Sequence, residues 1–183
     1  ERKEILKERI GYLPSEINYY DDMTSGQLLD YSAKFYRKAD KKKIKELAEY
    51  FELDLERKIE ELSYGNRKKV GIIQALLHEP ELLILDEPTG GVDPITRRQF
   101  WDLIYEAADS GVTVFVTTHY MDEAEYCNTI GMMYQAQLIA VASPDTLKDN
   151  LKGTLVQVNC DAPLKAESIA DKVKISDKDF FIL

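Results

Sequence analysis

The sequence predicts an α/β domain built on a parallel sheet. Residues 82–85 are four consecutive aliphatic residues without polar alternation, which is typical of a strand buried on both faces of a parallel sheet. A segment with apolar residues at helical spacing, 95–109, separates this run from a second apolar run at 112–116. The order strand, helix, strand predicts a βαβ unit. With 183 residues, 44% of them hydrophobic and 31% charged, the chain can form one α/β core with a small appendage.

The first third of the chain is predicted to hold one strand and then helices. Residues 9–13 form a short apolar run that stops at Pro14. Helices are expected at 27–36 and at 41–53. The second of these carries its apolar residues on one helical face: Ile44, Leu47, Ala48 and Phe51.

The middle of the chain alternates helices and strands, with turn residues between them. The helix expected at 68–77 stops at His78-Glu79-Pro80, and the helix at 95–109 stops at Ser110-Gly111. Further along we expect a hairpin of strands 130–134 and 138–141, then a strand at 154–160, a helix at 164–173 and a last strand at 180–183.

Composition excludes several classes of function. The net charge of −9, with 33 acidic against 24 basic residues, argues against a nucleic-acid surface, which requires clustered Lys and Arg. The two cysteines, Cys127 and Cys160, have no paired spacing, as in proteins of a reducing cytoplasm. No apolar segment approaches the roughly 20 residues that span a bilayer, so we expect a soluble chain that can serve a membrane partner.

Ionisable side chains follow both strands of the βαβ unit. Asp86 and Glu87 end the first strand, and His119 ends the second. Because a crossover makes the strands parallel, their carboxyl ends lie at the same sheet edge, where open α/β folds bind ligands. One carboxylate there can hold Mg²⁺, the next can polarise a water, and the histidine can contact a phosphoryl group. The alternative is that the two acids form a turn and a helix cap before Ile95.

A second candidate lies at the start of the 68–77 helix. In Leu62-Ser63-Tyr64-Gly65-Asn66, a serine precedes a glycine-containing turn. Such a turn offers a hydroxyl and free backbone N–H groups, which bind phosphate at a helix N-terminus. The alternative is that Ser63 is an ordinary N-cap.

Together these motifs resemble the nucleotide-binding domain of ABC transporters. "LSYGN" resembles the signature motif, usually LSGGQ, and "LLILDEP" resembles the Walker B strand with its following Glu. "GGVDP" at 90–94 resembles the D-loop, and "TTH" resembles the switch-histidine segment. The likeness covers residues 9 to about 145. It implies a P-loop NTPase-like parallel sheet core with a helical subdomain at about 17–61, a domain over 1–148, and an accessory domain beginning at 149–183.

The resemblance also implies a role for each matching residue. Asp86 would bind Mg²⁺, Glu87 would orient or activate water, and His119 would contact the γ-phosphate of ATP. Asp93 would lie in the loop that faces a second nucleotide-binding domain. In such head-to-tail dimers, three residues would touch the γ-phosphate of the nucleotide held by the opposite subunit: Ser63, Gly65 and Asn66.

Two departures from the family pattern bear on these expectations. The family's glutamine after the first strand is here Ser15, followed by Glu16, and either residue could take its place. A Walker A loop needs G-x-x-x-x-G-K-[ST], yet none of the nine glycines is followed by lysine. We therefore expect this chain to be a fragment that lacks the N-terminal strands and the P-loop, and to bind little ATP alone.

The function expected for the complete protein is an ATP-hydrolysing subunit of a bacterial exporter of drugs or peptides. Its cofactors would be ATP and Mg²⁺, and its partners a transmembrane permease and a second nucleotide-binding domain, at the cytoplasmic face of the membrane. A soluble ABC-type ATPase of translation or DNA repair, and a non-catalytic regulatory module, are the alternatives. Tyr19, Tyr20 and Met23 could seat a helix of the permease, or could pack locally against Tyr31 and Phe35.

Overall fold

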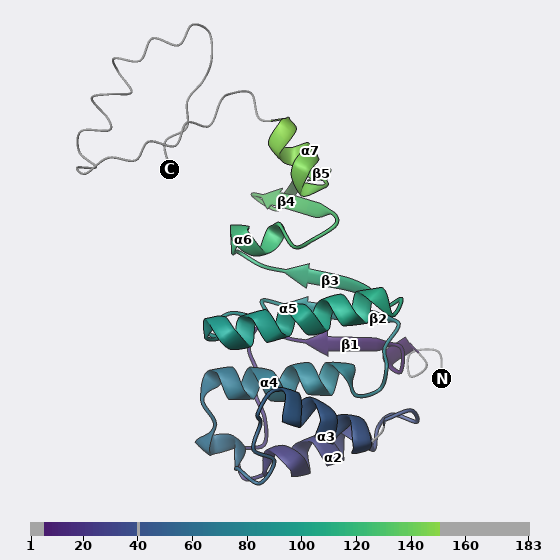
Figure 1. Cartoon of the computed structure of the whole chain (residues 1–183), viewed down its shortest axis with the longest axis vertical. Coiled ribbons are helices and arrows are strands. Elements are labelled where there is room, and N and C mark those ends of the chain that lie inside the picture. The colour runs from purple at the N-terminus through teal and green to yellow at the C-terminus, as the bar shows by residue number, and fades with distance from the viewer. Residues whose placement is uncertain (1–5, 40, 151–183) are drawn as a thin grey trace, which may run out of the picture. The chain divides into compact units, whose positions relative to one another are not determined.

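The computed structural model describes residues 6–39 and 41–150. These residues fall into two compact units, one ending at His119 and the next beginning at Tyr120. Each unit is described here by itself. The first unit contains the residues of both candidate sites. Figure 1 labels the helices and strands of both units.

A three-stranded parallel sheet forms the centre of the first unit. Its strands are β1 (Ile10–Leu13), β2 (Leu82–Asp86) and β3 (Thr113–Thr117), in the order β1-β2-β3. The register pairs Leu13 with Leu85, and Asp86 with Thr117. The predicted parallel α/β class is confirmed, and the carboxyl ends of the three strands meet at one edge.

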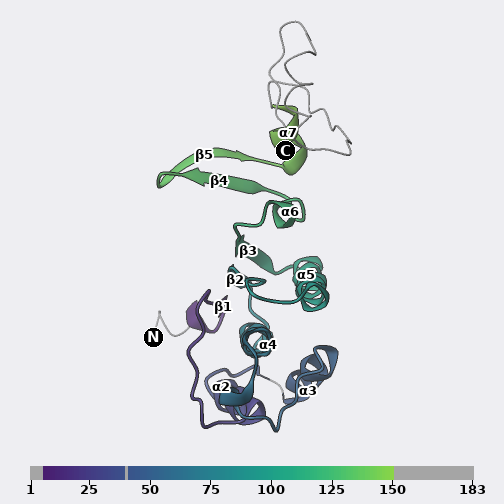
Figure 2. The ribbon, with the colours of Figure 1, turned by 90° about the vertical axis from the view of Figure 1, so that its left-hand side faces the viewer.

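The helices of this unit form two groups, one that contacts the sheet and one that contacts helix α4. Helix α4 (Tyr64–Leu76) contacts β1, and α5 (Pro94–Asp109) contacts β3. Helices α2 (Ser25–Ala33) and α3 (Lys41–Tyr50) pack on α4 rather than on the sheet. Figures 1 and 2 show α4 between the sheet and these two helices. The segment between β1 and β2 thus forms a helical layer attached through α4.

Two glycines allow α4 to approach β1 closely. A Cβ added at Gly11 would lie 2.2 Å from the carbonyl oxygen of Ala75, and one at Gly71 would lie 2.5 Å from a methyl carbon of Leu13. Side chains at these positions would push helix and strand apart. Fully buried residues lie on β1, on α4 and on the neighbouring strand β2: Leu13, Val70, Ile72, Ile73, Leu83 and Leu85.

The two faces of the sheet differ in burial. Leu83 and Leu85 of β2 are 0% exposed, whereas Leu82 and Ile84 are only half-buried, so the predicted burial on both faces is wrong for one face. Residues of the other face form a row across the strands, in which Tyr12 pairs with Ile84 and Ile84 with Phe115. Tyr12 and Phe115 are 56% and 59% exposed. This row is an apolar surface of the kind that parallel sheets usually cover.

Several helix boundaries differ from the sequence predictions because of local capping. Helix α4 begins four residues before the predicted Lys68, since the Ser63 side chain accepts a hydrogen bond from the backbone amide of Asn66. Helix α2 begins two residues before the predicted 27, after a capping box between Thr24 and Gln27. Helix α3 ends three residues before the predicted 53, where Glu52 adopts a φ of +51°.

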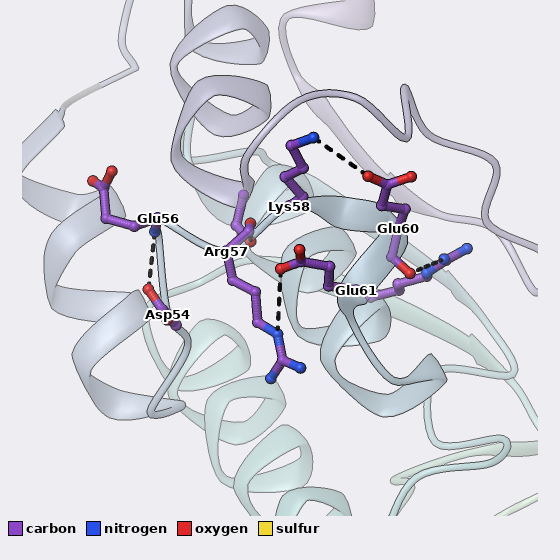
Figure 3. A network of polar contacts seen from close by, with 8 residues as sticks. Asp54, Glu56, Arg57, Lys58, Glu60 and Glu61 are labelled. Atoms are coloured by element: carbon purple, nitrogen blue, oxygen red, sulfur yellow. Dashed lines mark hydrogen bonds and ion pairs between the residues drawn. The ribbon is translucent and has the colours of Figure 1, made fainter.

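A charged turn lies between α3 and α4 (Figure 3). Its backbone runs through a 3₁₀ helix at Ile59–Glu61, which the sequence did not predict. Arg57 pairs with Glu61 at 3.9 Å, and Lys58 pairs with Glu60 at 3.4 Å. The carbonyl of Arg57 accepts hydrogen bonds from the amide and hydroxyl of Ser25, which tie this turn to the start of α2.

The second unit contains the predicted hairpin. Strands β4 (Ile130–Tyr134) and β5 (Gln137–Ala142) are antiparallel, joined through Gln135 and Ala136, both with positive φ. Two short helices were not predicted, α6 (Met121–Ala124) and α7 (Pro144–Asp149). The strands and helix predicted after residue 150 lie outside the described residues.

Within the described residues, no helix combines the length and apolarity that crossing a bilayer requires.

Candidate functional site

The structure brings Glu87 and His119 together at the carboxyl edge of the sheet. Glu87 directly follows β2, and His119 lies two residues beyond the end of β3. The His119 Nδ1 atom lies 3.1 Å from Glu87 Oε1. Both side chains stay partly open to solvent, with 59% of His119 and 44% of Glu87 exposed. The carboxylate and the imidazole therefore meet where an external ligand can reach both.

Asp86 is held in place by hydroxyl groups from two other segments. The Thr117 hydroxyl donates a hydrogen bond to Asp86 Oδ1. Ser15 contributes further hydrogen bonds through its hydroxyl and backbone amide. The bond from Thr117 is the main cause that lowers the pKa of Asp86, and the bonds from Ser15 act in the same direction, against partial desolvation. Asp86 is thus kept ionised, among hydroxyl oxygens.

The backbone of Glu87 adopts an uncommon conformation. Its φ is +45°, in the left-handed region that costs a non-glycine residue on the order of 1–3 kcal/mol. The Glu87 amide donates to the Thr117 carbonyl at 3.0 Å, while its own carbonyl accepts from the Gly90 amide at 3.3 Å. Lys68 Nζ also donates to the Glu87 carbonyl, at 3.1 Å. Hydrogen bonds on both sides of the residue therefore hold this turn.

The second candidate group lies at the N-terminus of α4. The Ser63 side chain accepts from the Asn66 amide at 3.2 Å, so the N-cap expected as the alternative is present. A Cβ at Gly65 would meet no atom within 4 Å, so packing within the described structure does not require a glycine there. The backbone around Gly65 is accordingly open to approach from outside. The structure places Ser63, Gly65 and Asn66 on an element separate from Asp86, Glu87 and His119.

Asp93 caps α5. Its Oδ1 atom accepts hydrogen bonds from the amides of Ile95 at 3.1 Å and Thr96 at 3.0 Å. The bonds from Thr96 are the largest cause that lowers the pKa of Asp93. A helix cap before Ile95 therefore exists, as one reading of the sequence suggested, but Asp93 provides it rather than Asp86 or Glu87.

Three residues at the site were not among the predicted site residues: Ser15, Tyr64 and Lys68. The Tyr64 hydroxyl donates to the Ser15 carbonyl at 3.0 Å, and a Cβ at Gly91 would lie 2.8 Å from the Tyr64 ring. Lys68 is 0% exposed. Its position could have been noticed, because Lys68 falls one helical turn from Ile72 on a buried face of α4. The sequence marked Ser15 only as one of two residues that could replace the family's glutamine, and it did not decide between Ser15 and Glu16.

The residues around Asp86 suit a hard cation. Within the described part of the chain, no three His, Cys, Asp or Glu side chains form a metal-binding group. Mg²⁺ in nucleotide sites is usually held by one or two carboxylates, with water and phosphate oxygens completing its six ligands. A single ionised carboxylate flanked by two hydroxyls fits this donor set. Asp86, with Ser15 and Thr117 beside it, could hold Mg²⁺ in this way.

The fold and the site define a class of protein: an α/β nucleotide-binding domain with acids and a histidine at the carboxyl edge of a parallel sheet. Comparison with known proteins agrees. The model of the ABC transporter family matches residues 1–90. The probable multidrug ABC transporter ATP-binding protein YbhF of Escherichia coli is 42% identical over 147 residues, which cover 78% of this chain and 25% of that protein. The chain belongs to the ABC transporter ATP-binding family.

Solved structures support the same fold. An ATP-binding subunit of an ABC transporter superposes with a TM-score of 0.73 at 25% identity, covering 80% of this chain and 64% of that one. A dimeric ATP-binding cassette in a post-hydrolysis state, bound to ADP and Pi, gives a TM-score of 0.69 at 23% identity, covering 77% and 65%. The chain therefore spans about a quarter of this Escherichia coli protein and about two thirds of the two solved ATP-binding domains.

Proposed function

We propose that the protein carrying this chain is the ATP-hydrolysing subunit of an ABC transporter. Glu87 orients or activates the attacking water, His119 contacts the γ-phosphate, and Asp86 would hold Mg²⁺, which would offset negative charge on the phosphates. The observation that carries the proposal is the 3.1 Å approach of His119 Nδ1 to Glu87 Oε1 beside the ionised Asp86. Phosphoryl transfer requires this combination of a metal carboxylate, a water-orienting group and a γ-phosphate contact.

We further propose that two such domains pair head to tail, so that Ser63, Gly65 and Asn66 of one contact the nucleotide of the other. The open surface above Gly65 supports this, because its backbone N–H groups at the helix N-terminus suit a phosphate from outside the chain. Asp93 would lie in the loop between the two domains, with its carboxylate fixed by the cap of α5. The proposal is supported by the solved cassette that shares this fold, because that cassette is dimeric.

Export of a drug or a peptide is the transport function that fits best, with a transmembrane permease as partner at the cytoplasmic face of the membrane. The support is the likeness to a protein described as a probable multidrug transporter subunit.

We propose that the nucleotide-binding domain extends over residues 1–148, with its helical subdomain at about 17–61 and an accessory domain from 149. Tyr20 lies edge-on to Tyr31, with ring centroids 6.3 Å apart, yet remains 60% exposed, which suits a surface for the permease.

The test is ATP hydrolysis and Mg-ATP binding by the full-length protein and its Glu87→Gln variant. We expect Glu87→Gln to lower kcat by a factor of about 10² or more, the usual contribution of a positioned acid or base, while Mg-ATP still binds. Glu81→Gln is the matched control, because Glu81 precedes the other end of β2 and pairs with Arg9 on the surface. Equal rates for Glu87→Gln and the wild type would contradict the proposed role.

A further inference from the structure

We propose that Lys68 is a positioning residue for ATP hydrolysis, whose buried ammonium group ties the backbone of Glu87 to the loop that carries Ser15. This inference rests on the proposed function for its kinetic consequence, but its structural part can be tested separately. Lys68 lies on α4, five residues after the N-cap Ser63. It therefore connects the signature-like helix to the acidic edge of the sheet within one chain.

The contacts of Lys68 reach the ends of two neighbouring strands. Its Nζ atom donates to the carbonyl of Glu87 at 3.1 Å and to the carbonyl of Pro14 at 3.3 Å. Pro14 follows β1 and Glu87 follows β2. One ammonium group thus joins the two loops on which the environment of Asp86 depends, because Ser15 contacts Asp86 and Glu87 is its neighbour.

The bond to Glu87 acts on the part of the turn that is conformationally costly. Glu87 has a φ of +45°, and such a conformation persists only where its surroundings fix it. Lys68 and the Gly90 amide both donate to the Glu87 carbonyl. A bond from a charged donor is stronger than one between neutral groups. Removing Lys68 would therefore loosen the peptide that directs the Glu87 carboxylate towards His119.

Burying the ammonium group of Lys68 costs free energy unless hydrogen bonds such as these offset it. The side chain is 0% exposed, and burying an ammonium group without partners is strongly unfavourable. The Tyr64 ring lies 5.8 Å from Nζ, within the range of a cation–π contact. An apolar residue would fill this helix face at lower cost. The lysine is accounted for by the two loop carbonyls that it holds.

The first experiment measures hydrogen exchange in the full-length protein with Lys68→Met. We expect exchange to rise on the order of tenfold or more in peptides that contain the Glu87 and Gly90 amides, as follows from losing a charged hydrogen bond. Lys69→Met is the matched control, because Lys69 is the next residue of α4 and donates to the Phe51 carbonyl at 2.9 Å rather than to the carbonyls of Glu87 and Pro14. We expect Lys69→Met to leave exchange at residues 82–91 unchanged.

The second experiment measures ATP hydrolysis by the same proteins. Lys68→Met is expected to lower kcat on the order of tenfold, with KM for ATP changed less than about twofold, because Lys68 acts through Glu87 and does not touch the nucleotide. In single-turnover reactions of the Glu87→Gln variant, adding Lys68→Met is expected to cause no further loss. If Lys68→Met acted only through a general loss of stability, it would lower the hydrolysis rate by the same factor in the wild type and in the Glu87→Gln variant. If Lys68→Met fails to fold, Lys68→Gln, which keeps an N–H donor of shorter reach, is expected to change exchange and kcat in the same direction.

The outcomes separate this inference from the proposed function. An active wild type whose Lys68→Met variant matches Lys69→Met in exchange and in kcat would overturn the inference and leave the proposed function standing. Full additivity of Lys68→Met with Glu87→Gln would also overturn it. A wild type without ATP hydrolysis would contradict the proposed function, while the exchange at Glu87 and Gly90 would still decide whether Lys68 holds the two loops.

Discussion

Asp86 and Glu87 are adjacent in sequence but differ in how the structure uses them. Asp86 ends a regular strand, and its carboxylate is fixed by hydrogen bonds from Thr117 and Ser15. Glu87 turns into the left-handed region, and its carboxylate meets His119. This change of backbone conformation sends two neighbouring acids to separate partners. It allows one short motif to supply both the proposed metal ligand and the proposed water-orienting group.

At the residue scale, Asp93→Ala is expected to lower the free energy of unfolding by about 1 kcal/mol at pH 7, the usual cost of losing an N-cap. Because hydrogen bonds lower the pKa of Asp93 in the folded state, this stabilisation is complete above the unfolded pKa of about 3.9. It is lost as the pH falls through the lower folded value. Urea denaturation of both proteins between pH 7 and pH 2 measures the difference.

The control is Asp93→Asn, which keeps a capping oxygen without the charge and should be less destabilising than Asp93→Ala. A difference between wild type and Asp93→Ala that stays constant down to pH 2 would contradict this account of the cap.

At the element scale, α4 joins the two candidate groups of this chain, the one at its N-terminus and the one at the carboxyl edge of the sheet. Its N-terminus presents Ser63 and Gly65, its buried face carries Lys68 to the strand ends, and Gly71 closes against β1. One rigid helix thus connects the surface proposed to meet a second domain with the turn proposed to orient water. Substitutions at Gly65 and Gly71 test separately the surface at the N-terminus of α4 and the packing of α4 against β1.

Gly65→Ala and Gly71→Ala are expected to have different effects on the stability of the folded protein. A Cβ at Gly65 meets no atom within 4 Å, so Gly65→Ala should keep or raise thermal stability but lower ATP hydrolysis of the full-length protein on the order of tenfold. A Cβ at Gly71 would lie 2.8 Å from the Tyr19 hydroxyl, so Gly71→Ala should lower the free energy of unfolding by about 1–3 kcal/mol. Thermal unfolding and ATPase assays measure both; an unfolded Gly65→Ala variant would contradict the assignment of its open surface.

The sequence predicted elements with strong local patterns better than elements set by long-range contacts. The run at 82–85 predicted β2 because four consecutive aliphatic residues without polar alternation are typical of a strand in a parallel sheet. Helix α6 and the 3₁₀ helix at Ile59–Glu61 were missed, because segments of three or four residues are too short to show periodicity. The approach of His119 to Glu87 followed from parallel topology. The contact of Ser15 with Asp86 did not, since it depends on how the loop after β1 folds back.

At the scale of the whole molecule, the proposed ATPase site is completed by groups that lie on different chains. Asp86, Glu87 and His119 belong to one sheet edge, whereas Ser63, Gly65 and Asn66 would serve the nucleotide of a paired domain. Such an arrangement makes hydrolysis depend on pairing, because neither surface alone surrounds the γ-phosphate. In the proposed assembly, a permease that moved the two domains apart or together would thereby control hydrolysis.

The most direct test is a crystal structure of the full-length protein with Mg-ATP bound, using Glu87→Gln to prevent turnover. We predict Mg²⁺ beside Asp86, the γ-phosphate within hydrogen-bonding distance, about 3 Å, of His119, and residue 87 separated from the γ-phosphate by one water molecule. A nucleotide whose γ-phosphate lies away from the carboxyl edge of the sheet, out of reach of His119, would contradict the account.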